Sequence, residues 1–184
     1  EGSDLKILNL LDNLNIKARK VGGAVVSILG NHELMNVDGD FRYVSLNEFA
    51  EFGNALGGSN NDDMPFGHKE RKCAFAPGGI IAKRLGQTRY GVAQVGSWIF
   101  VHGGITPKLA LKYSLDHINY YTKQWLLGNN SREVLRSIDE LFHNNDEDFS
   151  PYWVRIYSDH DDWNENRIRY LFNNTMKILN SRNK

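Results

Sequence analysis

An apolar run that ends in polar side chains is the feature that most constrains the fold of this chain. Residues 24–29 read Ala-Val-Val-Ser-Ile-Leu and lead directly into Gly30, Asn31, His32 and Glu33. A run with so few polar interruptions is typical of a strand that is covered on both faces. Because ligands gather at the carboxyl ends of such strands, the pattern predicts a functional site at Asn31 and His32.

A helix should precede this run, and a hairpin should follow it. Apolar residues recur at helical spacing from Asp4, a good N-cap residue, and the pattern stops at Gly22. Residues 90–95 and 98–101 are strand-like, and the Gly96-Ser97 pair between them is typical of a tight antiparallel hairpin. The second strand of this hairpin would end at His102.

The rest of the chain is predicted to be mainly helical. Helical patterns run from Thr106 to Leu127, from Ser131 to Phe142, and from a capping Asn164 to near the end. The polar segment 57–65 reads as a surface loop. Helices around buried strands give an α/β (α+β) fold class, and no repeat or boundary divides residues 1–184, so we expect a single domain.

Composition narrows the class of partner. The 22 basic residues balance the 22 acidic ones, which argues against a nucleic-acid or anionic membrane surface. No apolar stretch approaches the roughly 20 residues that cross a bilayer, so no membrane partner is expected. The lone cysteine, Cys73, excludes an internal disulfide and a thiolate metal cluster. A reducing compartment, by default the cytoplasm, is therefore expected, with Cys73 buried.

The side chains at the two strand ends are those that metal-assisted phosphoester hydrolysis uses. The Asn31 amide oxygen and a His102 ring nitrogen suit a divalent ion such as manganese, iron or zinc. Two such ions can clamp phosphoryl oxygens and generate hydroxide, while His32 can protonate the leaving oxygen as a general acid. The planar fork of an arginine suits the remaining phosphate oxygens, and Arg155 and Arg42 are the candidates.

These motifs resemble a known group of enzymes. The segments 29–36, Leu-Gly-Asn-His-Glu-Leu-Met-Asn, and 101–105, Val-His-Gly-Gly-Ile, are similar to the central motifs of calcineurin-like metallophosphoesterases of the phosphoprotein phosphatase type. The 29–36 string, followed by Gly39-Asp40-Phe41-Arg42-Tyr43-Val44-Ser45, is most similar to Shewanella-like protein phosphatases. The elements Pro77-Gly78-Gly79 and Trp153-Val154-Arg155 fit the same branch. The resemblance extends from about Leu5 to the final helix.

The resemblance implies a fold, a cofactor and roles for individual residues. The implied fold is a helix-flanked β-sandwich, incomplete at both ends, because the upstream Asp/His and Asp-Arg-Gly motifs and a downstream His motif are not in this sequence. Asn31 and His102 would hold one of two divalent metal ions (Mn, Fe or Zn), His32 would be the catalytic acid, and Arg155 would bind phosphate. We expect the parent protein to be a metallophosphatase, and this fragment alone to be inactive.

Three functions remain open at this point. The first is a protein phosphatase that acts on phosphoserine, phosphothreonine or phosphotyrosine in a phosphoprotein or phosphopeptide. The second is a dinucleoside polyphosphate hydrolase, which shares the same central motifs. The third is a non-catalytic binding module that keeps the fold without the full metal set. Fold resemblance by itself does not choose among substrates.

Several other residues that suggest chemistry have simpler interpretations. Arg42 and Arg155 could each be an ordinary ion-pair partner. The consecutive residues His160-Asp161-Asp162 are better explained as a solvated turn than as a metal cluster, because neighbours in a loop rarely all face one ion. The remaining histidines, His68, His117 and His143, lack supporting context and are interpreted as surface or packing residues.

Overall fold

The structure is a computed structural model that describes residues 3–59, 64–144, 148–158 and 164–182. The chain divides into two compact units, each built from segments that are distant in sequence. Unit 1 comprises Glu1–Ser27, His32–Arg89 and Leu126–Gly128, and unit 2 comprises Ile28–Asn31, Tyr90–Trp125 and Asn129–Lys184. Each unit is described by itself, and the single domain expected from the sequence stays a prediction.

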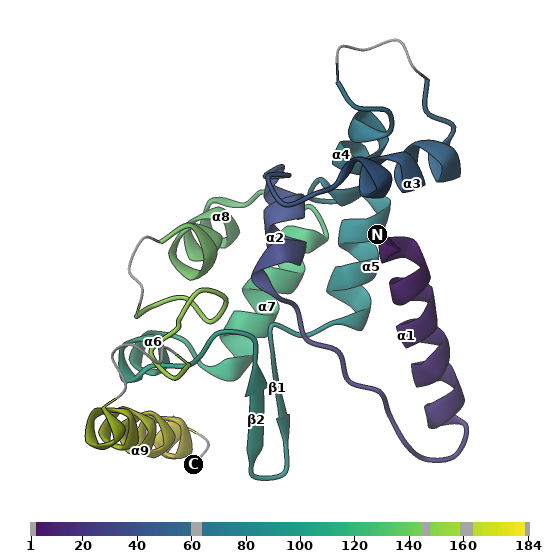
Figure 1. Ribbon diagram of the computed structural model, residues 1–184. Coiled ribbons are helices and arrows are strands. Elements are labelled where there is room, and N and C mark those ends of the chain that lie inside the picture. The colour runs from purple at the N-terminus through teal and green to yellow at the C-terminus, as the bar shows by residue number, and fades with distance from the viewer. Residues whose placement is uncertain (1–2, 60–63, 145–147, 159–163, 183–184) are drawn as a thin grey trace. The chain divides into compact units, whose positions relative to one another are not determined.

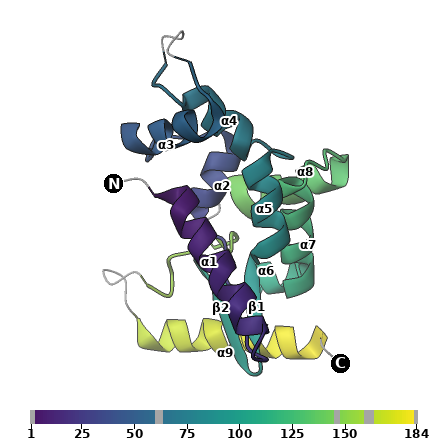
Figure 2. The same cartoon turned by 90° about the vertical axis from the view of Figure 1, so that its right-hand side faces the viewer.

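Unit 1 is helical in the part that the structure describes. Its helices are α1 (Asp4–Arg19), α2 (Asn31–Asp38, whose first residue belongs to unit 2), α3 (Leu46–Leu56), α4 (His68–Phe75) and α5 (Ile80–Thr88). Helix α4 packs against α3 and α5, and the core between them contains Phe49, Phe52, Phe75, Ile81 and Leu85. Helix α1 runs beside α5, as Figure 2 shows, and the Asp12 carboxylate binds both Arg84 and Arg89.

Unit 2 combines a β-hairpin with helices. The elements are β1 (Val92–Val95), β2 (Trp98–Val101), α6 (Pro107–Lys112), α7 (Leu115–Leu126, whose last residue belongs to unit 1), α8 (Arg132–Ile138), the π-helical turn η1 (Asp139–His143) and α9 (Glu165–Arg182). Its core contains Val92, Leu109, Ile118, Leu141 and Leu179 among others. Helix α6 packs against α9, and α9 crosses the hairpin (Figures 1 and 2).

The hairpin follows the sequence prediction closely. Strands β1 and β2 are antiparallel, with Val92 opposite Val101 and Val95 opposite Trp98, so Gly96 and Ser97 form a two-residue turn. Gly96 has a φ of 60°, whereas Ser97 has no positive φ. Positive φ at the first turn position alone is the type II′ pattern, which matches the twist of the flanking strands. His102 therefore follows the last residue of β2, as predicted.

The buried strand predicted at 24–29 is wrong. Ile28 makes only an isolated parallel bridge to Tyr90, and Val26 is 48% exposed. A strand needs a row of backbone partners along a neighbouring edge. The register of this bridge places Val26 opposite Thr88, the last residue of α5, so residues 24–26 face helical residues instead of a strand edge. In the other direction Val92 would pair with Gly30, but the Asn119 side-chain amide bonds both the N–H and the C=O of Val92. The apolar segment is therefore extended chain with one bridge.

Several predicted helices also agree with the structure in position. The predicted first helix corresponds to α1, and Asn164 caps α9 by accepting a hydrogen bond from the Arg167 N–H, as expected. Segment 106–127 is helical with a break between α6 and α7. The structure is thus mixed helix with a small two-stranded sheet, an α+β arrangement, and the β-sandwich implied by the resemblance is not seen in the residues described.

Three further expectations can be compared with the structure. Cys73 is exposed, so the prediction of a buried thiol is wrong; its neighbours Ala74 and Phe75 occupy the buried face of α4 instead. His68 does pack, against the rings of Phe41 and Phe49. The His160-Asp161-Asp162 turn and part of the 57–65 loop, residues 60–63, lie outside the described residues.

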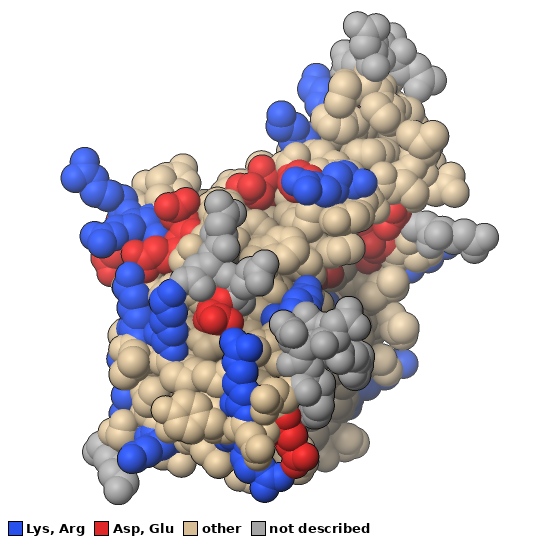
Figure 3. Space-filling model, turned by 60° about the vertical axis from the view of Figure 1, so that its left-hand side comes forward, with Lys and Arg blue, Asp and Glu red and all other residues tan. Residues whose placement is uncertain are grey.

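The described surface carries both signs of charge and no bilayer-crossing helix. On the face drawn in Figure 3, basic and acidic side chains occur side by side in several places. None of the helices that the structure describes is both long enough and apolar enough to cross a membrane.

Candidate functional site

His32 lies in the first turn of α2, on the surface of unit 1. Helix α2 begins at Asn31, so Asn31 and His32, which were predicted at the end of a strand, form the start of a helix. The His32 side chain is exposed, and its ring lies parallel to the Tyr43 ring, with centroids 4.9 Å apart and planes 3° apart. The imidazole is therefore accessible, and an aromatic ring covers one of its faces.

A pocket of about 240 Å³ lies beside this imidazole, entirely within unit 1. It is lined by residues of α1 to α5 and of the segment between α2 and α3: Asp4, Ile7, Leu8, His32, Glu33, Met35, Asn36, Asp40, Tyr43, Val44, Glu48, Arg71, Phe75 and Leu85. The lining mixes aliphatic side chains with carboxylates and one guanidinium. The pocket thus offers apolar contact and fixed charges next to a group that can carry a proton.

Two of the carboxylates at the pocket have pKa values that their surroundings lower. Arg42 binds Asp40 through two of its nitrogens, Nη2 to Oδ2 at 2.7 Å and Nε to Oδ1 at 3.0 Å, and this hydrogen bonding lowers the pKa of Asp40. Burial raises the pKa of Glu48, but hydrogen bonds with Ser45 and the nearby positive charge of Arg71 act in the other direction, and the pKa of Glu48 is lowered overall. The guanidinium of Arg42, a predicted phosphate ligand, thus already has a carboxylate partner.

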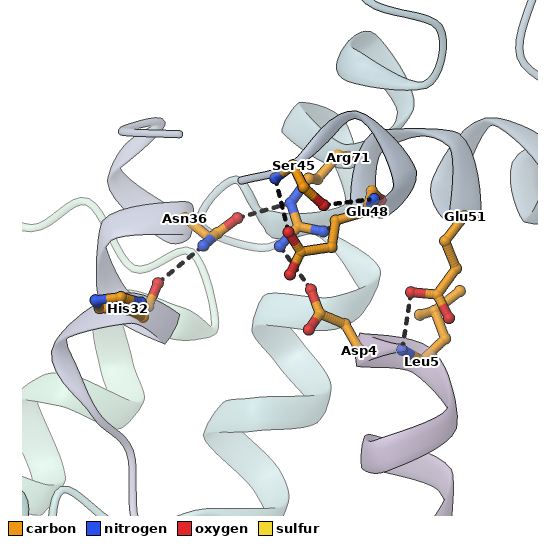
Figure 4. Close-up of polar contacts among 8 residues, drawn as sticks. All are labelled: Asp4, Leu5, His32, Asn36, Ser45, Glu48, Glu51 and Arg71. Atoms are coloured by element: carbon orange, nitrogen blue, oxygen red, sulfur yellow. Dashed lines mark hydrogen bonds and ion pairs between the residues drawn. The ribbon is translucent and has the colours of Figure 1, made fainter. Parts of the chain in front are cut away.

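Sequence reasoning missed the central charged residue of this pocket, Arg71 on α4. Its side chain is 3% exposed and binds Asp4 of α1 and Asn36 of α2 (Figure 4). Helix α4 is rich in charge, with the sequence His-Lys-Glu-Arg-Lys-Cys-Ala-Phe, so Arg71 looks like one of several solvated side chains. The only local signal is its spacing of four residues from Phe75, which places both on one helix face.

The other predicted site residues, Asn31, His102 and Arg155, belong to unit 2. Asn31 is 7% exposed and follows Leu29, whose N–H donates to the Tyr90 carbonyl just before β1. His102 follows β2 and is exposed. Asn31 therefore follows a segment that is hydrogen-bonded to the residues before β1, and His102 directly follows β2.

The loop after His102 is joined to the segment that carries Arg155. The Gly103 N–H donates to the Pro151 carbonyl at 2.9 Å. A Cβ atom on Gly103 would lie 2.9 Å from that oxygen and 3.0 Å from the Val154 N and O atoms, so only glycine allows this approach. The structure thus brings the His102 and Arg155 backbones together within unit 2.

Arg155 is exposed and oriented by its own backbone. Its Nη1 donates to the Val154 carbonyl at 3.0 Å. The segment before it is buried, because Tyr152 and Val154 are fully buried and Tyr152 is hydrogen-bonded to Thr122 at 2.8 Å. The exposed guanidinium of Arg155 thus follows a buried segment of backbone.

The donor set of unit 2 suits a divalent metal in part. An amide oxygen from Asn31 and an imidazole nitrogen from His102 are ligand types for manganese, iron or zinc. Within the described ranges, no group of three His, Cys, Asp or Glu side chains is arranged to hold an ion. These two residues would therefore hold an ion only together with further ligands.

The amino-acid sequence of the chain is similar to those of several known proteins. The chain is 37% identical over 160 residues, 79% of its length, to an uncharacterised protein of Acanthamoeba polyphaga mimivirus. It is 33% identical over 156 residues, 69% of its length, to Shewanella-like protein phosphatase 2 of Arabidopsis thaliana. The chain is related to a phosphatase.

Each of these matches covers only part of the related protein. An uncharacterised protein of Schizosaccharomyces pombe is also similar, at 31% identity over 137 residues and 74% of this chain. The chain spans 60% of the mimivirus protein, 40% of the Arabidopsis phosphatase and 38% of the yeast protein. No protein-family model and no solved structure matches the chain.

Proposed function

We propose that the protein containing this chain is a metal-dependent phosphomonoesterase of the calcineurin-like superfamily that removes phosphate from phosphoproteins. The observation that carries the proposal is the 33% identity to an Arabidopsis protein phosphatase, in a chain that has Asn31-His32 and His102-Gly103-Gly104 in that order. A helix-flanked β-sandwich for the whole protein belongs to the same proposal.

The environment of His32 supports its role as the general acid. A group that protonates a leaving oxygen needs access to substrate and a fixed orientation. The exposed ring of His32, parallel to Tyr43 and next to a pocket, has both properties. In the proposed reaction the imidazolium of His32 donates its proton to the departing alkoxide or phenoxide and leaves a neutral ring.

The remaining residues would bind the phosphoryl group. Asn31 and His102 would each give one ligand to a divalent ion, and Arg155 would bind phosphate oxygens with its exposed guanidinium. When bound, a pair of such ions clamps the phosphoryl oxygens and makes hydroxide available at neutral pH. Arg42 is the weaker candidate for phosphate, because substrate would have to compete with Asp40 for its fork.

The decisive assay compares substrate classes on the intact protein. Peptides that carry phosphoserine, phosphothreonine or phosphotyrosine are incubated with the protein and Mn²⁺, in parallel with diadenosine tetraphosphate and with a chelator control. We expect phosphate release from a phosphopeptide and its loss with the chelator. Hydrolysis of only the dinucleotide would replace the proposal with a dinucleoside polyphosphate hydrolase, and hydrolysis of neither would favour a non-catalytic module.

A substitution tests the role of the acid directly. His32→Asn should lower kcat on a phosphoserine peptide by about 10²- to 10⁴-fold. The loss should be much smaller on p-nitrophenyl phosphate, because its leaving group departs without a proton. Equal losses on both substrates would remove His32 from this role.

A further inference from the structure

Arg71 connects four helices of unit 1 through one guanidinium group. From α4 it binds the Asp4 carboxylate of α1 at 2.7 Å and the Asn36 Oδ1 atom of α2 at 2.8 Å, and its Nη1 points to the Glu48 carbonyl of α3 at 3.4 Å. The group also lies over two aromatic rings, 4.9 Å from each centroid, those of Phe52 and Phe75. Each nitrogen of the fork therefore has a direction set by a different helix.

The directed hydrogen bonds of Arg71 explain its burial better than a gain in folding stability does. Removing a guanidinium from water costs several kcal/mol, and an apolar side chain of similar volume often stabilises a core as well or better. What an apolar side chain lacks is a set of directed hydrogen bonds to several elements at once. The position of Arg71 thus points to a requirement for orientation.

The bond from Arg71 fixes the amide of Asn36. A guanidinium can only donate hydrogen bonds, so the amide oxygen of Asn36 must face Arg71 and the amide nitrogen must face the other way. On that side the nitrogen donates to the His32 carbonyl at 2.9 Å. Asn36 is 9% exposed, so water does not readily replace either bond. Figure 4 shows this line from Arg71 through Asn36 to His32.

The two hydrogen bonds of Asn36 thus connect Arg71 to the first turn of α2, which carries the imidazole. The bond to the His32 carbonyl constrains the first turn of α2, and His32, Asn36 and Arg71 line the same pocket. The His32 ring itself has an aromatic contact on one face, Tyr43. A rotation of the first turn of α2 would move the ring relative to Tyr43 and to the pocket.

We propose that Arg71 is a positioning residue for His32, acting through Asn36. It does not contact the substrate. By holding the amide of Asn36 in one orientation, it holds the first turn of α2 and aims the imidazole at the leaving-group oxygen. The inference rests on the proposed function, in which His32 is the general acid.

Kinetics with two leaving groups distinguish positioning from a general structural effect. In the intact protein, Arg71→Lys keeps a charge near Asp4 but loses the fork that reaches Asn36. A misplaced acid should lower kcat on a phosphoserine peptide by about 10-fold or more, change kcat on p-nitrophenyl phosphate by less than about 3-fold and leave KM within about 3-fold.

A second variant, at Asn36, tests the same hydrogen-bonded connection between Arg71 and His32. Asn36→Asp keeps an acceptor for Arg71 but turns a carboxylate oxygen toward the His32 carbonyl. It should reproduce the selective loss on the phosphoserine peptide. The double variant should be no worse than about 2-fold below either single variant, because both changes break one connection.

The matched control is Arg84→Lys. Arg84 also joins another helix of unit 1 to α1, through a 2.7 Å contact with Asp12, but has no bond to α2. Both kcat values should stay within about 2-fold of the parent protein. A selective loss in Arg84→Lys as large as that in Arg71→Lys would show that any loosening of α1 suffices, and the proposal would fail.

A spectroscopic measurement separates this inference from the proposed function. In a protein with ¹³C-labelled histidine, with the His32 signal assigned by His32→Asn, the nuclear Overhauser effect between the His32 and Tyr43 rings should weaken in Arg71→Lys and Asn36→Asp and persist in Arg84→Lys. An unchanged ring contact in both variants overturns the positioning role whatever the activity. A selective kinetic loss in His32→Asn but in neither variant overturns it too, while the acid role stands.

Discussion

The imidazole of His32 and the phenol ring of Tyr43 lie parallel, with centroids 4.9 Å apart and planes separated by 3°. Tyr43 is 64% exposed, so the pair stands at the surface. An aromatic ring in this position is not explained by burial alone. Stacking on this ring would favour one orientation of His32, the side chain that donates a proton in the proposed reaction.

Replacing Tyr43 should therefore loosen His32 without unfolding the protein. Tyr43→Ala should lower kcat on a phosphoserine peptide by about 3- to 10-fold. Tyr43→Phe keeps the ring and should stay within about 2-fold of the parent protein. Steady-state kinetics on the intact protein check both values. If the phenylalanine variant loses as much as the alanine variant, the hydroxyl rather than the stacking matters.

Metal content should depend on His102. His102→Ala should lower the amount of bound manganese, iron or zinc, since an imidazole ligand is lost. Elemental analysis of the purified intact protein measures this. His117→Ala is the control, because His117 is also an exposed histidine of unit 2 but packs near Tyr121. Equal metal content in the parent protein and in His102→Ala would remove His102 from the ligand set.

Gly103 should not tolerate a side chain. A methyl group there would lie 2.9 Å from the Pro151 oxygen, and backbone atoms cannot give way as a flexible side chain can. Gly103→Ala should lower the free energy of unfolding by about 1–3 kcal/mol and raise KM by moving Arg155. Denaturant unfolding and steady-state kinetics measure the two effects.

The control for this change is Gly23→Ala. A methyl group on Gly23 would meet the Ala18 oxygen at 3.5 Å, an ordinary contact, and Gly23 has no positive φ. Its free energy of unfolding should change by less than about 0.5 kcal/mol. A Gly103→Ala protein as stable as this control would contradict the close approach of the two loops.

Asp12 should stabilise unit 1 in a pH-dependent way. Burial raises the pKa of Asp12, but hydrogen bonds from Arg89 and Arg84 outweigh it and lower the pKa overall. Because the folded pKa lies below the unfolded value, this stabilisation is present above about pH 4 and is lost as pH falls through the folded pKa. Asp12→Asn should cost about 2 kcal/mol at pH 7. Urea unfolding of both proteins should show this difference shrinking below pH 4, whereas a constant difference would contradict the ionised pair.

Local signals in the sequence predicted many of the elements. The apolar periodicity of α1, the Gly96-Ser97 turn and the Asn164 cap each act within a few residues, and each appears in the structure. His32 and His102 are exposed, the first at the start of α2 and the second directly after β2. Their joint action in catalysis stays a prediction.

The segment 24–29 shows why apolar composition alone can fail to predict a strand. Its apolar composition predicts a buried strand, but composition does not supply a partner edge. In the register of the Ile28–Tyr90 bridge, Val26 lies opposite Thr88, which is the end of α5, and the backbone groups of Val92, opposite Gly30, are bonded by the Asn119 amide. No local pattern within the segment reveals which residues will lie opposite it.

The sequence by itself determined the local elements and the chemical types of the candidate site residues, because caps, turn glycines and apolar periodicity act over short distances. Only the tertiary structure decided which backbone edges are occupied and which charges are buried. Arg71 reads as one more charged residue of α4, yet it binds Asp4 at a separation of 67 residues and connects to His32 through Asn36. The physical reason is that a buried charge needs partners in space, and those partners come from helices brought together by folding.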